Sequence, residues 1–282
     1  MQLSLGTVQF GLAYGAVGSG HQVTPEVAAS ILAQAWDDGV RLLDTAASYG
    51  DIESRLRGLC DKRPFRIVSK IRPLGPLSGP EKTQALLRSI EGSVSALGEQ
   101  LDALLFHSAA DLLSSDGDAL WKAARLALAG STVRLGVSCY APQELIELRS
   151  RFDIQIAQLP GNALDQRLRQ MPALDGVELH LRSAFLQGLL LQSQAGARRV
   201  PAATKALQAW EAKCTQARLT PAVAALGVVK DLPRVAHCVV GVESLDQWRE
   251  IHQAWREAQV LHWPDLASDD PQVFDPRVWP KS

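Results

Sequence analysis

Cysteine is scarce in this sequence, and its spacing suggests neither disulfide pairing nor metal binding. The chain has 282 residues and only four cysteines, at positions 60, 139, 214 and 238. They lie far apart and form no Cys-x-x-Cys pair, so we interpret them as reduced thiols of a cytoplasmic protein. Compact sets of His, Cys and Asp, such as His-Glu-x-x-His, are missing as well. No metal site is therefore predicted.

The chain also lacks an excess of either charge and any long apolar run. Its 29 basic residues nearly balance 30 acidic ones, for a formal net charge of -1, which argues against nucleic acid or an anionic membrane as the main partner. No apolar run reaches the roughly 20 residues of a membrane-spanning helix. The sequence begins without a basic segment followed by an apolar run, so no signal peptide is expected. We expect a soluble protein with neither a nucleic-acid nor a membrane partner; its oligomeric state is left open.

The sequence does contain a regular alternation of strand-like and helix-like segments. Apolar residues make up 46% of the chain, enough for a sizeable core. Apolar runs predict strands at residues 3–9, 41–44, 66–70, 101–107, 133–138, 154–159, 177–182 and 238–242. Helical patterns lie between them, at residues 25–38, 81–97, 118–129, 143–150, 204–217 and 245–258. Eight such units predict a single α/β domain over residues 1–282, a (β/α)8 TIM barrel. An open doubly wound sheet is the alternative.

The segment from residue 260 to 282 shows no such period. It contains four prolines together with Trp263, Phe274 and Trp279. We expect these aromatic side chains to fix an irregular extension to the barrel. Whether the extension also lines a pocket is left open.

Ionisable residues stand at the carboxyl ends of the predicted strands, where a barrel of this type binds its ligands. Asp44 ends the second strand, and Tyr49 follows in a loop of small residues. Lys70 ends the third strand and His107 the fourth. Positions two residues earlier face the barrel interior and are apolar or small: Leu42, Val68, Leu105, Gly136 and Ile156. The pattern predicts a polar rim above an apolar interior.

The seventh strand departs from this pattern, because Glu178, His180 and Arg182 all have the inward phase. Arg66 and Arg134 share that phase on other strands. An unpaired buried carboxylate is costly. We therefore expect an ionic contact from Glu178 to one of these two arginines.

Asp44, Tyr49, Lys70 and His107, in this order, resemble the catalytic tetrad of the aldo-keto reductases. Residues 5–11 look like the first strand of that family, and residues 43–50 are similar to its second-strand signature. Further matching fragments follow at residues 68–70, 105–107, 135–138, 158–162, 182–188 and 240–244. The resemblance implies that Tyr49 is the general acid/base, that Lys70 and Asp44 tune it, and that His107 orients the substrate oxygen. Each residue taken alone also has a structural interpretation, as a cap, a packing aromatic, a rim charge or a satisfied histidine.

The resemblance also implies a nicotinamide dinucleotide, NADP or NAD, and a small carbonyl substrate. Ser138 and Gln158 match the positions that hold the nicotinamide carboxamide. Gly241, Ser244 and the following helix N-terminus are expected to bind the cofactor phosphates. The other positions that the resemblance assigns to cofactor binding are Gly6, Thr7, Arg182, Ser183 and Glu250.

Some cofactor positions differ from the family pattern. Cys139 stands where the family usually has Asn, and Arg182 where a tyrosine stacks under the nicotinamide. Glu243 and Gln247 stand where NADPH-selective members carry basic residues. A carboxylate near a ribose 2′-position favours a hydroxyl over a phosphate. We therefore expect weakened selectivity for NADPH, or a preference for NADH, unless Arg249 restores a phosphate contact.

Two loops are candidates for the same site. Residues 188–201, with Arg198 and Arg199, either cover the dinucleotide or form a solvated loop. The glycine-rich residues 15–20 lack the Lys-Ser/Thr of a phosphate loop and are interpreted as the flexible first βα loop.

The favoured function is an NAD(P)H-dependent oxidoreductase that reduces an aldehyde or ketone, or oxidises the alcohol. Residues 182–191 look like those of a divergent bacterial branch of the family, often associated with sugar or cell-surface polysaccharide biosynthesis, which implies a polar, sugar-like substrate. An isomerase or epimerase that retains its nicotinamide cofactor is one alternative. A non-catalytic binding module derived from a reductase is another.

Overall fold

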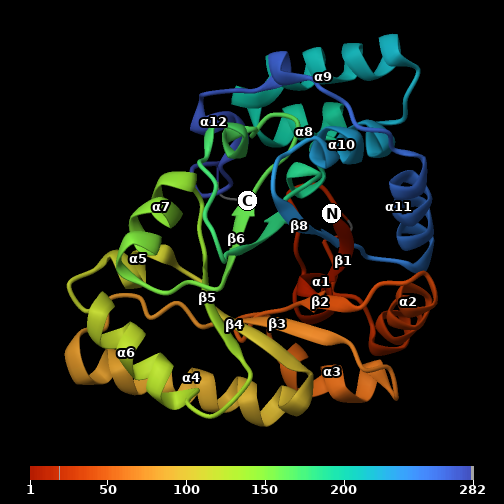
Figure 1. The fold of residues 1–282 in the computed structure, drawn as a ribbon. Coiled ribbons are helices and arrows are strands. Elements are labelled where there is room, and N and C mark those ends of the chain that lie inside the picture. The colour runs from red at the N-terminus through yellow and green to blue at the C-terminus, as the bar shows by residue number, and fades with distance from the viewer. Residues whose placement is uncertain (19, 281–282) are drawn as a thin grey trace.

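Eight parallel strands close into a barrel in the computed structural model, which describes residues 1–18 and 20–280 (Figure 1). The strands follow chain order around the barrel, and β1 pairs with β8 to close it. They are β1 (Gln2–Gly6), β2 (Leu42–Asp44), β3 (Arg66–Ile71), β4 (Leu101–Phe106), β5 (Arg134–Ser138), β6 (Ile156–Pro160), β7 (Glu178–Arg182) and β8 (Val235–Gly241). The predicted single-domain TIM barrel is confirmed, and the open sheet is excluded.

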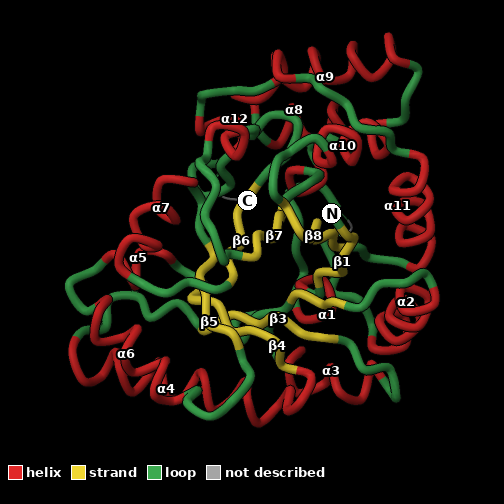
Figure 2. Tube along the Cα trace, viewed as in Figure 1, coloured by secondary structure: helices red, strands yellow, loops and turns green. Residues whose placement is uncertain are grey.

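The helices surround the strands, as the red and yellow segments of Figure 2 show. The α-helices are α1 (Val8–Gly11), α2 (Pro25–Asp37), α3 (Ile52–Cys60), α4 (Gly79–Leu97), α5 (Ala109–Leu113), α6 (Gly117–Ala127), α7 (Pro142–Arg151), α8 (Ser193–Arg199), α9 (Thr204–Ala217), α10 (Pro221–Lys230), α11 (Leu245–Glu257) and α12 (Pro271–Phe274). Short 3-10 turns are η1 (Gly98–Gln100), η2 (Arg167–Gln170), η3 (Leu186–Gly188), η4 (Pro201–Ala203) and η5 (Pro264–Leu266). Among the described residues, no helix is long and apolar enough to span a membrane.

Local sequence explains where several helices begin. The hydroxyls of Thr24 and Thr220 accept from the backbone N–H groups of Val27 and Val223, and a proline occupies the first turn of each helix. These N-caps satisfy amide groups that the helix itself leaves unpaired. Helix α10, which begins after Thr220, forms part of a cavity wall described below.

The first strand is shorter than predicted. It ends at Gly6 rather than at residue 9, and the short helix α1 follows. Thr7 still donates its backbone N–H to the Asp44 carbonyl of β2, 2.9 Å away, and α1 begins at the next residue. Gly11 then packs so closely on the Tyr49 carbonyl oxygen that a Cβ would lie 1.9 Å from it. This contact places α1 against the loop that carries Tyr49. The eighth strand starts at Val235, three residues earlier than predicted, because Val235 pairs with Leu179 of β7.

The barrel interior is filled, as the inward phase of the strands predicts. Leu42, Val68, Ala103, Leu105 and Ile156 form one buried cluster inside the barrel, separate from the larger core between strands and helices. Gly136 lies in the same layer, where a Cβ would come within 1.9 Å of the Ile156 carbonyl oxygen. The apolar interior closes the barrel axis below the polar rim, so ligands reach only the rim.

A polar network occupies the lower end of the barrel, where the strands begin. Arg134 pairs with Glu178 at 3.1 Å and with Asp102 at 2.5 Å, so the predicted contact of Glu178 is to Arg134. Glu178 also contacts His180 Nε2 at 2.8 Å. The ligand atoms of Glu178, His180 and His237 lie within 4.8 Å of one another. Arg134 and His180 already bind the carboxylate of this trio, and we assign no metal to it. The side chain of Glu178 is 29% exposed, which places the network at the solvent edge of the barrel.

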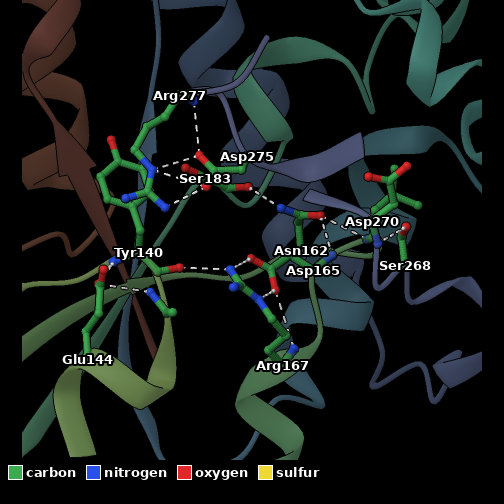
Figure 3. Close-up of polar contacts among 12 residues, drawn as sticks. Tyr140, Glu144, Asn162, Asp165, Arg167, Ser183, Ser268, Asp270, Asp275 and Arg277 are labelled. Carbon is green, nitrogen blue, oxygen red and sulfur yellow. Dashed lines mark hydrogen bonds and ion pairs between the residues drawn. The ribbon is translucent and has the colours of Figure 1, made fainter. Parts of the chain in front are cut away.

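The segment after α11 packs along the outside of the barrel and over one side of its upper end. Trp263 meets Trp210 edge to face, with ring centroids 6.0 Å apart, and Phe274 and Trp279 are buried. Arg277 pairs with Asp275 beside Tyr140, and Arg167 pairs with Asp165 close by (Figure 3). Polar and aromatic contacts therefore join this segment to the loops after β5 and β6. Ser19 of the glycine-rich loop and residues 281 and 282 of the C-terminal segment lie outside the described residues.

Candidate active site

A cavity of about 650 Å³ opens at the carboxyl ends of the strands, within the size range of sites for small organic ligands. Its walls come from both ends of the chain: the β1 end and the following loop, the loops after β7 and β8, the start of α10, and one face of α11. Asp44 and Tyr49 line it from the side of β2. The cavity thus reaches the rim where the tetrad was predicted.

Asp44 and Lys70 form a buried ion pair at this rim. Lys70 Nζ lies 2.7 Å from Asp44 Oδ2 and 2.9 Å from the Thr45 carbonyl oxygen. The side chains of Lys70 and Asp44 are only 1% and 8% exposed. A buried charge requires a partner of this kind. The pair is therefore held by its own hydrogen bonds and is not a solvated rim charge.

Tyr49 and His107 lie close to this pair. Lys70 Nζ is 5.3 Å from the centroid of the Tyr49 ring. The His107 ring meets the Tyr49 ring edge to face, with centroids 5.9 Å apart, and His107 Nδ1 lies 3.1 Å from Ser48 Oγ. Within the described chain, no hydrogen bond joins the Tyr49 hydroxyl to Lys70 or His107. The structure thus brings the four predicted side chains together, while the hydroxyl remains available to another partner.

Burial governs the protonation of these groups. Desolvation raises the pKa of Tyr49 well above its ordinary value, the Asp44 carboxylate raises it further, and the Arg182 charge acts in the opposite direction. Burial lowers the pKa of His107 to about 3, with the Lys70 charge adding to the effect. Burial also lowers the pKa of Lys70, which the Asp44 carboxylate opposes. At neutral pH the site therefore presents a protonated phenol and a neutral imidazole.

Gln158 connects the ion pair to the cavity. Its Nε2 donates to Asp44 Oδ1 over 2.7 Å, so Asp44 is held by Lys70 on one oxygen and by Gln158 on the other. The Oε1 atom of Gln158 is buried and has no hydrogen-bond partner, although the residue lines the cavity. An unpaired buried acceptor is costly. Gln158 is therefore preorganised to accept a hydrogen bond from a ligand in the cavity.

The family to which this chain belongs follows from comparison with known sequences. A model of the aldo/keto reductase family matches residues 2–264. The chain belongs to the aldo/keto reductase family. Among curated proteins, none matches it significantly.

Solved structures agree with this aldo/keto reductase fold. A Pseudomonas aeruginosa protein described as an aldo-keto reductase superposes with a TM-score of 0.65 at 22% identity, over 91% of this chain and 90% of that one. The aldo-keto reductase AKR11C1 from Bacillus halodurans, in its holo form, gives a TM-score of 0.71 at 18% identity, over 98% and 94% of the two chains. At these identities the likeness shows the shared fold.

The candidate cofactor residues of this aldo/keto reductase divide into two groups. Six of them line the cavity: Gly6, Gln158, Arg182, Ser183, Gly241 and Glu250. Three do not: Thr7 donates to the Asp44 carbonyl, Ser138 is buried in β5, and Ser244 caps helix α11. The first group includes the unpaired Gln158 Oε1, which fits the amino group of a carboxamide. The cavity as built therefore suits a nicotinamide dinucleotide.

Several wall residues carried no signal in the sequence. Gln9 has a buried, unpaired Oε1, and it approaches Gly241 so closely that a Cβ there would lie 2.5 Å from that oxygen. The loop after β7 contains four residues of positive φ: Ser183, Leu186, Gln187 and Gly188. A positive φ is unfavourable for Ser183, Leu186 and Gln187 but not for glycine, so the surrounding structure holds these three residues in a strained conformation beside the cavity. Ser183, Gly188 and Gly241 belong to fragments that resemble the family, but the positive φ of Leu186 and Gln187 and the unpaired Gln9 Oε1 leave no trace in the sequence.

The first βα loop meets the strained loop across the cavity. Val17 donates its backbone N–H to the Gln187 carbonyl over 3.2 Å, and Gln187 Nε2 donates to the Tyr14 hydroxyl at the same distance. Val17 and Gln187 both line the cavity. These contacts form a bridge over part of the cavity. Arg198 and Arg199, by contrast, belong to α8 and do not line the cavity; Arg199 donates to the Pro280 carbonyl.

Proposed function

We propose that this chain is an NAD(P)H-dependent oxidoreductase that reduces an aldehyde or ketone, or oxidises the corresponding alcohol. One observation carries the proposal: Asp44 binds Lys70 and Gln158 at once, and Gln158 keeps a free acceptor in the cavity wall beside Tyr49. The charged pair of the tetrad and the acceptor for a carboxamide are thus parts of one network. A cavity for an unrelated ligand has no need of this linkage.

The side chains have the properties that carbonyl reduction requires. When bound, the reduced nicotinamide supplies a hydride to the carbonyl carbon, and negative charge develops on the oxygen. Tyr49, kept protonated by burial, donates its phenolic proton to that oxygen. The charge of Lys70, fixed by Asp44, stabilises the phenolate that remains. His107, kept neutral by burial, orients the carbonyl by a hydrogen bond.

Substitution of Tyr49 tests this function. Tyr49→Phe removes the proton donor but keeps the ring, so kcat with NADH or NADPH and a panel of aldehydes should fall by about 100-fold or more. Its circular dichroism and cofactor affinity should match the wild type. Tyr140→Phe is the matched control, because Tyr140 has a hydroxyl without a hydrogen bond among the described residues and does not line the cavity. Equal activities in Tyr49→Phe and the wild type would refute the assignment. Turnover of a substrate with no net consumption of cofactor would instead indicate an isomerase.

We also propose that the cofactor is NADH rather than NADPH. Among the described residues that line the cavity, Glu243, Glu250 and Glu257 bring acidic side chains to the side formed by α11 and the β8 loop, where no basic residue stands. Arg249, the nearby candidate for a phosphate contact, pairs with Asp246 and does not line the cavity. A 2′-phosphate here would meet carboxylates.

Dissociation constants for both cofactors test the preference, with tryptophan fluorescence as the signal. NADH is expected to bind more tightly than NADPH. Gln247→Arg adds a cation to the cavity side of α11 and should narrow or reverse the ratio of the two dissociation constants. Gln208→Arg, at an exposed position of α9 that does not line the cavity, serves as the control. NADPH binding a hundredfold tighter than NADH in the wild type would refute the proposal.

A further inference from the structure

Arg182 is a cation without an anion. Among the described residues that line the cavity it is the sole basic one, and no carboxylate of the described chain lies within ion-pair distance of it. Within residues 1–18 and 20–280 its guanidinium makes two hydrogen bonds, to Ser183 Oγ at 3.4 Å and to the Cys139 carbonyl oxygen at 3.2 Å. A guanidinium carries five N–H donors. Most of its hydrogen-bonding capacity is therefore unused.

Stacking holds this guanidinium in place. Arg182 lies over the Tyr140 ring, 4.2 Å from its centroid, and Arg277 lies over the same ring at 3.9 Å. Both guanidinium groups therefore lie against one ring, that of Tyr140. Arg277 is neutralised by Asp275 at 2.6 Å, as Figure 3 shows beside the Tyr140 ring. Arg182 has no such partner in the part of the chain that the structure describes, so the stack presents one uncompensated charge to the cavity.

The charge of Arg182 reaches the reacting groups. Burial is the largest cause of the shifted pKa values of Tyr49, Lys70 and His107. The Arg182 charge opposes the raised pKa of Tyr49 and adds to the lowered pKa values of Lys70 and His107. The Lys70 charge is balanced by Asp44, so the excess positive charge at this rim comes from Arg182. A nicotinamide bound nearby becomes cationic on oxidation, which a neighbouring guanidinium alone disfavours. An anion placed between them removes that conflict.

We propose that Arg182 is a subsite for an anionic group of the substrate, and that the carbonyl compound reduced by this enzyme carries a carboxylate. The inference rests on the proposed reductase function and names its substrate class. It assigns Arg182 to the substrate, whereas the resemblance places this residue beside the nicotinamide. The planar fork of a guanidinium matches a carboxylate with two parallel hydrogen bonds. The diphosphate of the cofactor is the other anion that Arg182 can meet, and the experiment separates the two.

Matched substrates provide the test: 4-carboxybenzaldehyde and its methyl ester, methyl 4-formylbenzoate, assayed with saturating NADH. The wild type should prefer the acid, and Arg182→Met should lower kcat/KM for the acid by about 100-fold and for the ester by less than about 3-fold. Arg182→Lys should recover part of the loss. Arg277→Met removes the guanidinium that Asp275 neutralises beside the same ring and should leave the acid-to-ester ratio unchanged.

Three outcomes overturn the proposal: an equal loss for acid and ester in Arg182→Met, an unchanged ratio, or a loss confined to NADH affinity, which would assign the guanidinium to the diphosphate. A direct binding measurement keeps this test separate from the proposed function. Benzoate should bind the NADH-loaded wild type and not NADH-loaded Arg182→Met, as followed by calorimetry. If no aldehyde is reduced but benzoate still distinguishes the two proteins, the reductase function fails and the anion subsite stands. If benzoate does not distinguish them, the subsite fails.

Discussion

The buried pair of Asp44 and Lys70 gives a prediction whose size follows from the structure. Lys70 is 1% exposed and keeps Asp44 Oδ2 at 2.7 Å. Asp44→Asn replaces the carboxylate oxygen by an amide and leaves an ammonium group buried without a counter-charge. Removing one partner of a buried pair costs about 3–5 kcal/mol. For a domain of this size that corresponds to a decrease in Tm of about 6–10 °C, at about 2 °C per kcal/mol.

A double-mutant cycle isolates the pair from the side effects of each substitution. Lys70→Met alone leaves the Asp44 carboxylate with Gln158 as its hydrogen-bond donor, so it too should be destabilising. Asp44→Asn combined with Lys70→Met buries no charge, and its loss should be smaller than the sum of the single losses by about 2 kcal/mol. Urea unfolding at pH 7 measures all four proteins. Additive losses, or a loss below about 1 kcal/mol for Asp44→Asn, would contradict the reasoning.

The pH dependence of the Asp44→Asn variant provides an independent check. Burial lowers the pKa of Lys70, and Asp44 opposes this effect, so the pKa falls further without Asp44. In the unfolded chain the lysine keeps its proton up to about pH 10. Between the two pKa values the unfolded state binds more protons, so stability rises with pH. The difference in the free energy of unfolding between the wild type and Asp44→Asn should therefore become smaller between pH 7 and pH 9.

Three further outcomes are expected. The pKa of His107 is about 3 in the folded protein and about 6.5 in the unfolded chain, so the contribution of the neutral ring to stability is lost as pH falls from 6.5 to 3. His107→Gln should therefore show a smaller Tm difference between pH 7 and pH 5 than the wild type. An identical difference in the two proteins would contradict this. Gly188→Ala places a side chain at a φ of 92° and within 2.5 Å of the Val17 carbonyl oxygen, so it should open the bridge over the cavity and speed NADH release in stopped-flow measurements, whereas unchanged release would exclude a role for the bridge. Arg134→Met leaves Glu178 and Asp102 without their shared cation at the partly solvated lower end of the barrel and should cost roughly 2 kcal/mol in urea unfolding, with kcat unaffected; a loss of kcat would show that this network reaches the rim.

The fold and the positions of the candidate catalytic residues could be predicted because their signals are local. Alternation of apolar runs with helical periods specifies eight βα units, and Asp44, Lys70 and His107 stand where strands end. The N-caps at Thr24 and Thr220 depend only on neighbouring residues. Features of this kind can be recognised in a single sequence because they depend on neighbouring residues and not on contacts with distant ones.

The remaining features of the site depend on contacts between distant residues. The stack of Arg182, Tyr140 and Arg277 joins three segments, and nothing in their sequence spacing indicates that they meet. The early end of β1 at Gly6 accompanies the close packing of α1, through Gly11, on the loop that carries Tyr49. The backbone of the loop after β7 is likewise set by tertiary context, because Leu186 and Gln187 adopt positive φ although neither is glycine.

The closure of the barrel between β1 and β8 has a consequence for how a ligand affects the whole molecule. The cavity straddles this seam, with Gly6 and Gln9 on one side and Gly241 and Glu243 on the other. A dinucleotide that contacts residues on both sides of this seam stabilises the pairing of β1 with β8. At a hundred times its dissociation constant, such a ligand stabilises the folded state by about 2.7 kcal/mol. On ligand binding, amide hydrogen exchange should therefore slow more in β1 and β8 than in the other strands of the barrel.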